Sequence, residues 1–531
     1  MADLSIDILG TSITISTDEE KEYLKTLLEK YRVTVEKVRR MSGLKEPLKI
    51  AVLTGFLLCD DLEKAGAGGV RDKTEQGSEA EQLTLGMISR LDEALGVPAG
   101  IEKREDTQEK TPAEGKPGAF YKLRNTVKNY EWGSPEWIPT LLGEKNLSRV
   151  PWAELWMGVN PSGPSRIILP PLKSAAGDGE ILLSDFIDRE ARTAPEDITQ
   201  GAKLPYLFKV LAAAMPLSIQ AHPNREQARQ GYERENREGI PLDAPDRSYK
   251  DPNHKPEIIC ALSPFAALCG FRNAGQIKNL IGALCGYSQG TLKDSLENLF
   301  NALGNEENPY RSFLAALFSL ETETLVALGA FIKSRRALFE RDFPDYRDEW
   351  ELCSYLAGLY PGDPGVLAPL YLNIIELAPG EAIYLPAGIF HAYIHGMGME
   401  LMADSDNVLR GGLTPKHIDT PELFSVLIFS EFKPEILRAP VPALSWFSYP
   451  TPAEEFRLSV IRGTGGVLSW SEPGPSIIIL TEGSAVVSET ETGDELALIK
   501  GESIFIPAGT NRNIRFSGTF SAYAAAPGKI P

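Results

Sequence analysis

The sequence has few cysteines and no closely spaced pair of them. The five cysteines are odd in number and form no Cys-x-x-Cys motif; they are Cys59, Cys260, Cys269, Cys285 and Cys353. A disulfide-rich secreted domain or a thiolate metal site would need more cysteines at regular spacing. We therefore expect reduced, mostly structural thiols, as in a cytoplasmic protein.

Long apolar runs and an excess of positive charge are also missing. No apolar run approaches the ~18 residues of a membrane span, and the N-terminus, Met1-Ala2-Asp3-Leu4, lacks the basic and apolar regions of a signal peptide. The formal net charge of −19 argues against nucleic acid or an anionic membrane as a partner. A small anionic substrate stays compatible, because a local cluster of Lys and Arg can override the global charge.

Histidine is scarce as well, and its placement is informative. All five histidines lie between positions 222 and 417, and three of them stand in short blocks. The blocks are Gln220-Ala221-His222, Asn253-His254-Lys255-Pro256-Glu257, and residues 385–391, which end in His391. Histidine is the commonest neutral metal ligand near pH 7, so the blocks suggest a metal centre. His395 and His417 stand in no such block, and we expect them to be structural or surface residues.

The length of 531 residues predicts roughly two to four domains, and 43% hydrophobic with 24% charged residues is typical of a soluble globular protein. Residues 1–95 begin with two alternating segments, 4–9 and 12–15, that predict a hairpin and are followed by helical periodicity. Residues 96–118 are rich in Glu, Lys, Pro and Gly and predict a flexible linker. From Phe120 onward short strands and turns prevail, with a helical interval at about 273–357.

An internal repeat indicates the architecture of the rest. Residues 380–388 (Gly-Glu-Ala-Ile-Tyr-Leu-Pro-Ala-Gly) recur as residues 501–509 (Gly-Glu-Ser-Ile-Phe-Ile-Pro-Ala-Gly). A strand that ends in a Pro-Ala-Gly turn, preceded by another strand, is the texture of a jelly-roll barrel such as a cupin. The first copy continues to His391, whereas the aligned residue of the second copy is Arg512, which cannot ligate a cation.

We therefore predict a mainly β fold with α insertions. It would contain a metal-bearing cupin barrel at 119–272 and 366–430, an inserted helical domain at 273–365, and a metal-free cupin barrel at 431–531. A small α+β module with the order ββα would precede them at residues 1–95.

That N-terminal module resembles the ZapA family of cell-division ring proteins. The resemblance rests on Ile6-Asp7-Ile8-Leu9-Gly10, the helix after Glu19-Glu20, and Ile50-Ala51-Val52-Leu53. It implies self-association, or contact with an FtsZ-type filament, through residues 1–95. Thr11 stands where a basic residue often follows the glycine in that family, so a plain oligomerisation or packing module is the alternative.

The candidate metal ligands share one face by their spacing. Gln220 and His222 are two residues apart on the apolar strand 217–222, so both point to the same side. His391 lies just past the turn of the repeat, and Glu257 follows a proline that restricts its backbone. Two His, one Glu and one Gln form an N/O ligand set suited to zinc or another divalent first-row ion.

The residues around these ligands are similar to the type I mannose-6-phosphate isomerase family over nearly all of residues 119–531. The matching blocks, in chain order, are residues 121–125, 130–133, 153–158, 218–223, 253–257, 386–393 and 405–416. The resemblance implies one Zn²⁺ per chain, held by Gln220, His222, Glu257 and His391, and Arg410 as the catalytic arginine. It further implies a sugar-phosphate pocket lined by Lys209, Ser218, Lys255, Tyr393, Glu400, Asp406 and Lys416.

The implied reaction is the reversible isomerisation of mannose 6-phosphate and fructose 6-phosphate, which would feed mannose catabolism or GDP-mannose synthesis. Zinc would stabilise charge on the sugar oxygens, and a base would move a proton between C2 and C1. Lys255, Glu400 and His254 are the candidates for that base, and the sequence does not choose among them. Arg410 suits a phosphate or an enediolate oxygen, and Lys209, Lys416 and Ser218 suit the phosphate.

Two other functions compete with this one. The chain could be a division-ring accessory protein with a vestigial isomerase half, although the complete ligand set and Arg410 argue against decay. It could also be a cupin dioxygenase or a sugar epimerase. Non-haem iron oxygenases use two His and one carboxylate, so Gln220 as a fourth ligand counts against them.

Overall fold

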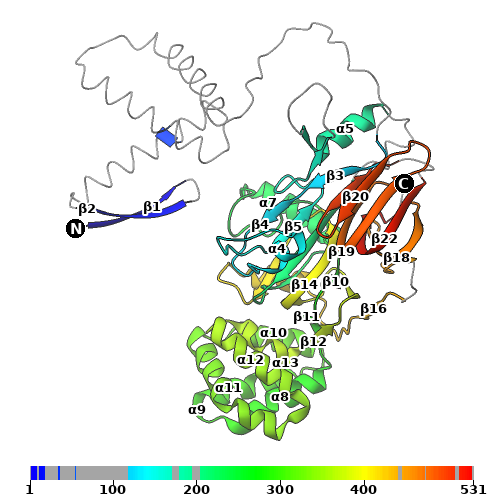
Figure 1. The fold of residues 1–531 in the computed structure, drawn as a ribbon. Helices are drawn as coiled ribbons and strands as arrows, with labels where there is room; N and C mark the ends of the chain where they lie inside the picture. The colour runs from blue at the N-terminus through cyan, green and yellow to red at the C-terminus, as the bar shows by residue number, and fades with distance from the viewer. Residues whose placement is uncertain are drawn as a thin grey trace, which may run out of the picture. The chain divides into compact units, whose positions relative to one another are not determined.

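The computed structural model describes residues 2–8, 11–17, 34–35, 54, 118–169, 179–193, 204–440, 445–472, 474–508 and 513–528. The chain forms two compact units, Met1–Gly115 and Lys116–Pro531 (Figure 1). In the first unit, β1 (Ala2–Ile8) and β2 (Thr11–Thr17) pair antiparallel with Ile6 opposite Ile13, which confirms the predicted hairpin. The helices predicted for the rest of residues 18–95, and most of the predicted linker at 96–118, lie outside the described residues.

The second unit begins with an eleven-stranded sheet ordered β16-β13-β10-β14-β8-β5-β4, with β9, β11, β12 and β15 attached to it. Its strands are β4 (Thr126–Lys128), β5 (Glu154–Met157), β8 (Tyr206–Ala213), β9 (Ile219–Ala221), β10 (Glu257–Ala261), β11 (Phe265–Phe271), β12 (Leu372–Leu377), β13 (Glu381–Leu385), β14 (His391–Ala403), β15 (Leu409–Gly412) and β16 (Leu437–Arg438).

Strand β14 organises this sheet, because it pairs with β8, β9, β10 and β11. The strand is 13 residues long. Its pairing with β11 shifts register between Ala266 and Ala267, opposite His395 and Tyr393. At the next residue, Gly396, φ is +128° and a Cβ would lie 2.7 Å from the Pro264 carbonyl oxygen, so only glycine fits there. The strand therefore pairs regularly with its neighbours on each side of one register shift, near His395 and Gly396.

A nine-stranded sheet forms the other end of the unit, in the order β17-β18-β22-β19-β21-β3-β6-β7 with β20 beside β19. Its strands are β3 (Tyr121–Arg124), β6 (Arg166–Ile168), β7 (Glu180–Leu182), β17 (Ser445–Ser448), β18 (Arg457–Trp470), β19 (Ser476–Glu489), β20 (Glu495–Ile499), β21 (Ser503–Ile506) and β22 (Ile514–Ala526). Figure 1 shows the strands of this sheet that come from the C-terminal residues, such as β18 and β22, together in orange and red.

The second sheet differs from the predicted division of the chain. Strand β3 pairs with β21, with Lys122 opposite Ile504, and β6 and β7 continue the sheet outward. Three strands from residues 119–272, which were predicted to belong wholly to the first barrel, therefore complete the sheet of the C-terminal residues. Long-range strand pairing of this kind leaves no local signal in the sequence.

An apolar core joins the two sheets. It contains Phe208 and Val210 of β8 together with Leu458 of β18 and Ile477 of β19, all at most 2% exposed. The second sheet holds a further core of its own, formed by side chains such as Ile461, Ile478, Leu480, Val487, Ile504 and Phe516. Burial of these large side chains provides most of the driving force for the unit.

Helices fill the chain between β11 and β12. They are α8 (Ala274–Tyr287), α9 (Gly290–Ala302), α10 (Pro309–Phe318), α11 (Thr322–Asp342), α12 (Arg347–Leu359) and α13 (Ala368–Tyr371), with short 3-10 turns at Pro344–Tyr346 and Pro364–Leu367. They gather beside β11 and β12 in Figure 1. Trp350 is fully buried and stacks on Phe339 at 4.7 Å. The helices thus continue beyond the predicted interval, as far as Tyr371.

Four shorter or isolated helices flank the sheets: α4 (Trp137–Leu142), α5 (Leu183–Thr193), α7 (Arg225–Arg237) and α14 (Thr420–Val426). Helix α7 begins with a capping box, in which the Asn224 side chain accepts from the Gln227 backbone and Gln227 accepts from Asn224. Its first residue, Arg225, follows three positions after His222 and so lies near the candidate metal centre in sequence.

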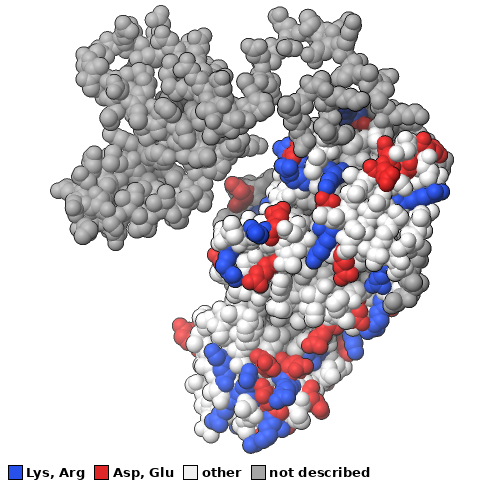
Figure 2. Space-filling view, in the orientation of Figure 1, with Lys and Arg blue, Asp and Glu red and all other residues white. Residues whose placement is uncertain are grey.

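Two surface properties bear on possible partners. Among the described helices, none is by itself both long and apolar enough to cross a membrane. Helices α10 and α11 are long and apolar enough only when taken together, and the chain bends by 105° between them. On the face drawn in Figure 2, acidic and basic side chains are interspersed over the second unit.

Candidate metal centre and active site

Strand pairing brings together side chains that are distant in sequence. Lys209 of β8 lies opposite Glu400 of β14 and also opposite Trp156 of β5. Cross-strand partners point to the same face of a sheet, as do residues two apart on one strand. Glu257, which starts β10, lies opposite Met402 and so shares the face of Glu400. On the neighbouring strands, Gln220 of β9 lies opposite both His391 and Arg410.

Three of the four predicted ligands form a buried cluster. His222, Glu257 and His391 are at most 2% exposed. Glu257 Oε1 lies 3.3 Å from His222 Nε2, and Glu257 Oε2 lies 3.4 Å from His391 Nε2. These are the only three described side chains among His, Cys, Asp and Glu that meet the geometry of a metal cluster.

Gln220 adjoins the cluster, with its amide group 3.5 Å from His391 Nε2. A half-turn of the amide places Oε1 at that position, where it can ligate a cation. A tetrahedral zinc ion with bonds of about 2.0–2.1 Å separates its ligand atoms by about 3.3–3.4 Å. The separations between His222 and Glu257, between His391 and Glu257, and between Gln220 and His391 are close to that value.

Backbone carbonyls orient both imidazole rings. His222 Nδ1 donates to the Asn407 carbonyl at 2.7 Å, and His391 Nδ1 donates to the Ile389 carbonyl at 2.9 Å. Because a carbonyl only accepts, the proton resides on Nδ1, and the lone pair on each Nε2 faces Glu257. This is the tautomer that a metal ligand needs.

The electrostatics of the cluster favour a cation. Burial lowers the pKa of His222 to about 4, so the ring is neutral near pH 7. Burial alone would raise the pKa of Glu257, but Lys255 and the two histidines lower it well below its usual range. Within the described part of the chain, His222 Nε2 and Glu257 Oε2 are buried without a hydrogen-bond partner. A divalent cation would satisfy both atoms, so the residues present fit such a group.

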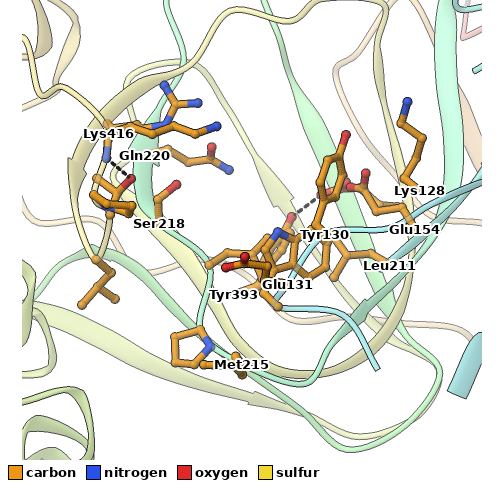
Figure 3. A pocket seen from close by; sticks show the side chains of 18 of the residues that line it. Lys128, Tyr130, Glu131, Glu154, Leu211, Met215, Ser218, Gln220, Tyr393 and Lys416 are labelled. Atoms are coloured by element: carbon orange, nitrogen blue, oxygen red, sulfur yellow. Dashed lines mark hydrogen bonds between the residues drawn. The ribbon is translucent and has the colours of Figure 1, made fainter. Parts of the chain in front are cut away.

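A large pocket of about 1150 Å³ opens beside this cluster. Ten of the predicted site residues line it: Lys209, Ser218, Gln220, Lys255, Glu257, Tyr393, Glu400, Asp406, Arg410 and Lys416. Figure 3 shows Ser218, Gln220 and Lys416 on one side of the pocket and Tyr130 and Glu154 on the other. The two histidine rings are buried beside Glu257, which reaches the pocket itself.

His254 is not brought into this pocket. Its Nε2 lies 2.7 Å from Glu455 Oε1 and 3.2 Å from Arg225 Nη2, away from the residues that line the cavity. Glu455 precedes β18, so the partner of His254 comes from the second sheet. His395 and His417 are exposed, and His395 packs edge-on against Trp137 at 5.1 Å. Both have the structural or surface placement that the sequence predicted.

A buried charged network forms the floor of the pocket. Lys209 Nζ lies 2.8 Å from Glu154 Oε1 and 2.7 Å from Glu400 Oε2. Tyr393 donates its hydroxyl to Glu400 at 2.7 Å, and Trp156 Nε1 donates to Glu154 at 2.9 Å. Burial alone would lower the pKa of Lys209, but the two carboxylates raise it, so the ammonium stays charged. Burial raises the pKa of Glu400.

Glu154 and Trp156 were not predicted as site residues. All four residues of β5 are buried, so a glutamate in this strand needs a cationic partner, and Lys209 provides it. An acidic residue inside a short apolar strand is the signal that could have found Glu154. The same pairing shows that Lys209, which was predicted to hold the phosphate, is already engaged by two carboxylates.

Positive charge gathers at the other side of the pocket. Burial lowers the pKa of Arg410. Burial, followed by the neighbouring charges of Arg410 and Lys250, lowers the pKa of Lys416. Like charges held close together are stabilised by an anion, so this corner suits a phosphate group.

Two family models match the chain, and known proteins are similar to most of it. Residues 120–274 match the family model described as "Phosphomannose isomerase type I, catalytic domain", and residues 4–95 match the one described as "Cell division protein ZapA". The chain is 38% identical over 398 residues to the mannose-6-phosphate isomerase of Salmonella typhimurium, covering 73% of this chain and 94% of the relative. The Homo sapiens enzyme is 31% identical over 423 residues, covering 75% of this chain and 95% of the relative.

Solved structures are similar as well. A crystal structure of mannose 6-phosphate isomerase from Salmonella typhimurium, "bound to substrate (f6p) and metal atom (zn)", matches with a TM-score of 0.67 and 35% identity over 77% of this chain and 100% of that one. A zinc-bound holo structure of mannose 6-phosphate isomerase matches with a TM-score of 0.67 and 36% identity over 77% and 100%. On these grounds the chain belongs to the family of type I mannose-6-phosphate isomerases.

Proposed function

We propose that the chain interconverts mannose 6-phosphate and fructose 6-phosphate, an aldose–ketose isomerisation, with one zinc ion. One observation carries the proposal: two imidazoles oriented by backbone carbonyls share the carboxylate of Glu257 at the wall of a pocket that Arg410 and Lys416 also line. The related crystal structure with fructose 6-phosphate and zinc supports the substrate and the metal.

The two sheets are proposed to be the two cupin barrels expected from the repeat. The repeat copies lie at equivalent places, since β13 precedes β14 in the first sheet and β21 precedes β22 in the second. The helices between β11 and β12 are then an insertion into the first barrel. Arg512, the counterpart of His391 in the second copy, lies outside the described residues.

Gln220, His222, Glu257 and His391 would hold the metal. When bound there, zinc supplies Lewis-acid stabilisation of negative charge on the sugar oxygens. The protein contributes the orientation of the ligands, through the carbonyls of Asn407 and Ile389.

Glu400 is the base that the geometry supports best. Its carboxylate lines the pocket, lies 2.7 Å from Lys209 Nζ, and has a pKa raised by burial, and a carboxylate with a raised pKa is a stronger base. Lys255 also lines the pocket, but its Nζ lies 3.2 Å from Glu257 Oε1, so it is placed to stabilise charge beside the ligands. His254 faces Glu455 instead of the pocket, which disfavours it as the base.

Arg410, Lys416 and Ser218 would bind the phosphate at the positive corner. Arg410 offers a planar fork of donors and Lys416 a point charge, and in the described part of the chain neither side chain is engaged by a carboxylate. Tyr393 donates to Glu400 and so orients it. Asp406, at the pocket wall, is placed to accept from sugar hydroxyls.

Residues 1–95 are proposed to serve self-association or contact with a division filament, on the strength of the ZapA match. The mass in solution of the whole chain, compared with that of a chain beginning at Phe120, tests the first possibility. Identical oligomeric states would contradict it.

The isomerase proposal is tested with the full chain by following fructose 6-phosphate formation from mannose 6-phosphate, with and without a chelator. We expect turnover that the chelator abolishes and that added zinc restores. Absence of turnover by the zinc-loaded chain, or turnover that survives complete removal of metal, would overturn it.

A further inference from the structure

We propose that Asp363 is a positioning residue that holds the loop between Arg410 and Lys416, and thereby sets the phosphate-binding corner. The inference rests on the proposed function and deepens it. Asp363 lies between α12 and the following 3-10 turn, so it comes from the helical part of the unit, whereas the loop follows β15 of the first sheet. It lines the pocket but was not among the site residues predicted from the sequence.

The carboxylate of Asp363 accepts three backbone hydrogen bonds. Oδ1 accepts from the N–H of Gly365 at 2.7 Å and from that of Leu413 at 2.8 Å. Oδ2 accepts from the N–H of Thr414 at 3.2 Å. Two of these donors belong to the short stretch between Arg410 and Lys416. The carboxylate therefore contacts the loop backbone directly between the two cationic side chains.

The loop backbone needs such support, because Leu413 has φ +52°, in the left-handed region. A branched, buried side chain rarely adopts that conformation and is held in it only when its surroundings impose it. The hydrogen bond from the Leu413 N–H to Asp363, at 2.8 Å, is a contact that holds the backbone in this conformation. Release of this bond would allow the loop to relax toward φ below zero and carry Lys416 with it.

Close packing leaves the loop little other freedom. Gly412 has φ +143°, and a Cβ there would lie 2.8 Å from the Gly365 Cα. A Cβ on Gly365 would lie 2.9 Å from the Leu413 nitrogen. The two glycines thus permit the backbones of the helical segment and the loop to touch, which brings the Asp363 carboxylate within reach of the loop N–H groups.

The same segment contacts the opposite wall of the positive corner. The Tyr360 hydroxyl donates to the Pro216 carbonyl at 3.0 Å, two residues before Ser218. Residues 359–365 therefore connect the strand of Ser218 and Gln220 with the loop of Arg410 and Lys416. Figure 3 shows Ser218 and Lys416 on the same side of the pocket. The spacing between these phosphate-binding groups depends on this one segment.

Asparagine is the informative substitution. An amide has one acceptor oxygen where the carboxylate has two, so Asp363→Asn keeps the shape but cannot accept from all three N–H groups. With loss of one charge-assisted bond, we expect the Kd for inorganic phosphate, and the KM for mannose 6-phosphate, to rise about tenfold. The kcat and the zinc content should change little, because the ligand cluster does not contact Asp363.

The experiment measures phosphate binding by titration calorimetry on the full, zinc-loaded chain, together with steady-state kinetics and zinc content. Gly365→Ala provides a second variant, since its Cβ would lie 2.8 Å from Asp363 Oδ1 and 2.9 Å from the Leu413 nitrogen, and it should likewise weaken phosphate binding. Asp294→Asn is the matched control, because Asp294 is an exposed aspartate on α9 of the same helical part. It should behave like the unaltered chain.

A phosphate Kd within twofold of the unaltered chain in Asp363→Asn would overturn the inference. Zinc loss in parallel with the loss of phosphate affinity would also overturn it, since it would mark a general structural role. No phosphate binding by the unaltered chain would overturn it as well. An unaltered chain that binds phosphate but turns over no sugar phosphate would instead contradict the proposed function alone.

Discussion

The two sheets of the second unit contain copies of the same strand-turn repeat, yet they bury different kinds of side chain. The first sheet buries Lys209, Glu154 and Glu400 in one network and His222, Glu257 and His391 in another. The core of the second sheet is formed by aliphatic and aromatic residues such as Ile478 and Phe516. The removal of charged groups from water costs free energy that pairing only partly offsets. The paired charges of the first sheet therefore stabilise the fold less than apolar side chains of similar volume would.

The architecture alone therefore does not produce the site. Where the repeat aligns the two copies, Arg512 stands in place of His391. All five histidines precede residue 418, so residues 418–531, which form most of the second sheet, contain none.

Removal of the shared carboxylate should have the largest effect. In Glu257→Ala the two imidazoles lose the group between them, and we expect zinc affinity to fall by more than about a hundredfold, beyond the loss known for outer-shell partners. Turnover should fall with it. Glu495→Gln, an exposed glutamate of the second sheet, is the control and should keep both. Full zinc occupancy in Glu257→Ala would contradict the metal assignment.

Substitution of the proposed base should separate chemistry from metal binding. Glu400→Gln keeps the shape and the contact with Tyr393, and we expect kcat to fall about 10²–10⁴-fold with zinc content unchanged. Exchange of the C2 proton of the substrate with solvent, followed by NMR, should slow to the same degree. If Lys255→Ala stops this exchange while Glu400→Gln does not, Lys255 is the base.

Loss of the side chain that supports His222 should weaken the metal site without removing a ligand. The Asn407 amide donates to the carbonyls of Asp251 and Asn253 at 2.7 and 2.8 Å and accepts from Lys250 at 2.7 Å. In Asn407→Ala the backbone that orients His222 loses these bonds, so zinc affinity should fall about 10–100-fold. Competition with a fluorescent chelator measures it; an unchanged affinity would show that the backbone is held by other contacts.

Truncation in the second core should affect stability and leave the chemistry intact. Ile478 is fully buried in β19, and Ile478→Ala should lower the free energy of unfolding by about 2–5 kcal/mol. Zinc content and KM at a temperature well below the unfolding midpoint should not change. A shift in KM would mean that the second sheet shapes the pocket.

Restoration of histidine in the second copy should have no effect on metal content. Arg512→His reproduces the residue type of His391, but residues 418–531 contain no other histidine to serve as a second imidazole ligand. We expect zinc to remain at one per chain by elemental analysis. A second zinc would show that the second sheet has kept more of a site than its sequence suggests.

Three of the four residues predicted as metal ligands, His222, Glu257 and His391, lie together in the structure, and Gln220 adjoins them. Their signal in the sequence is local: His222 follows β9 directly, and Glu257 and His391 each start a strand. The position of His254 could not be predicted, since its partner Glu455 is 201 residues away. The pairing of β3 with β21, in which Lys122 lies opposite Ile504, spans a still longer stretch of the chain, and neither contact leaves a signal in either segment alone.

The role of Asp363 was hidden for the same reason. An Asp-Pro-Gly sequence predicts a turn, and its side chain does accept from the N–H of Gly365 two residues on. The other two bonds reach across to Leu413 and Thr414, about fifty residues later in the chain. Local rules explain the turn, and only the folded arrangement explains why the turn lies beside the pocket.

The register shift in β14 has a consequence for how this enzyme can vary in length. Tyr393 and Glu400 are an odd number of residues apart, so a regular strand would direct them to opposite faces, yet they meet at 2.7 Å. The register shift near Gly396 turns the side chains that follow it to the other face, which places Glu400 on the side of Tyr393. The gain or loss of a single codon between 393 and 400 would reverse that change and direct Glu400 away from Tyr393 and His391.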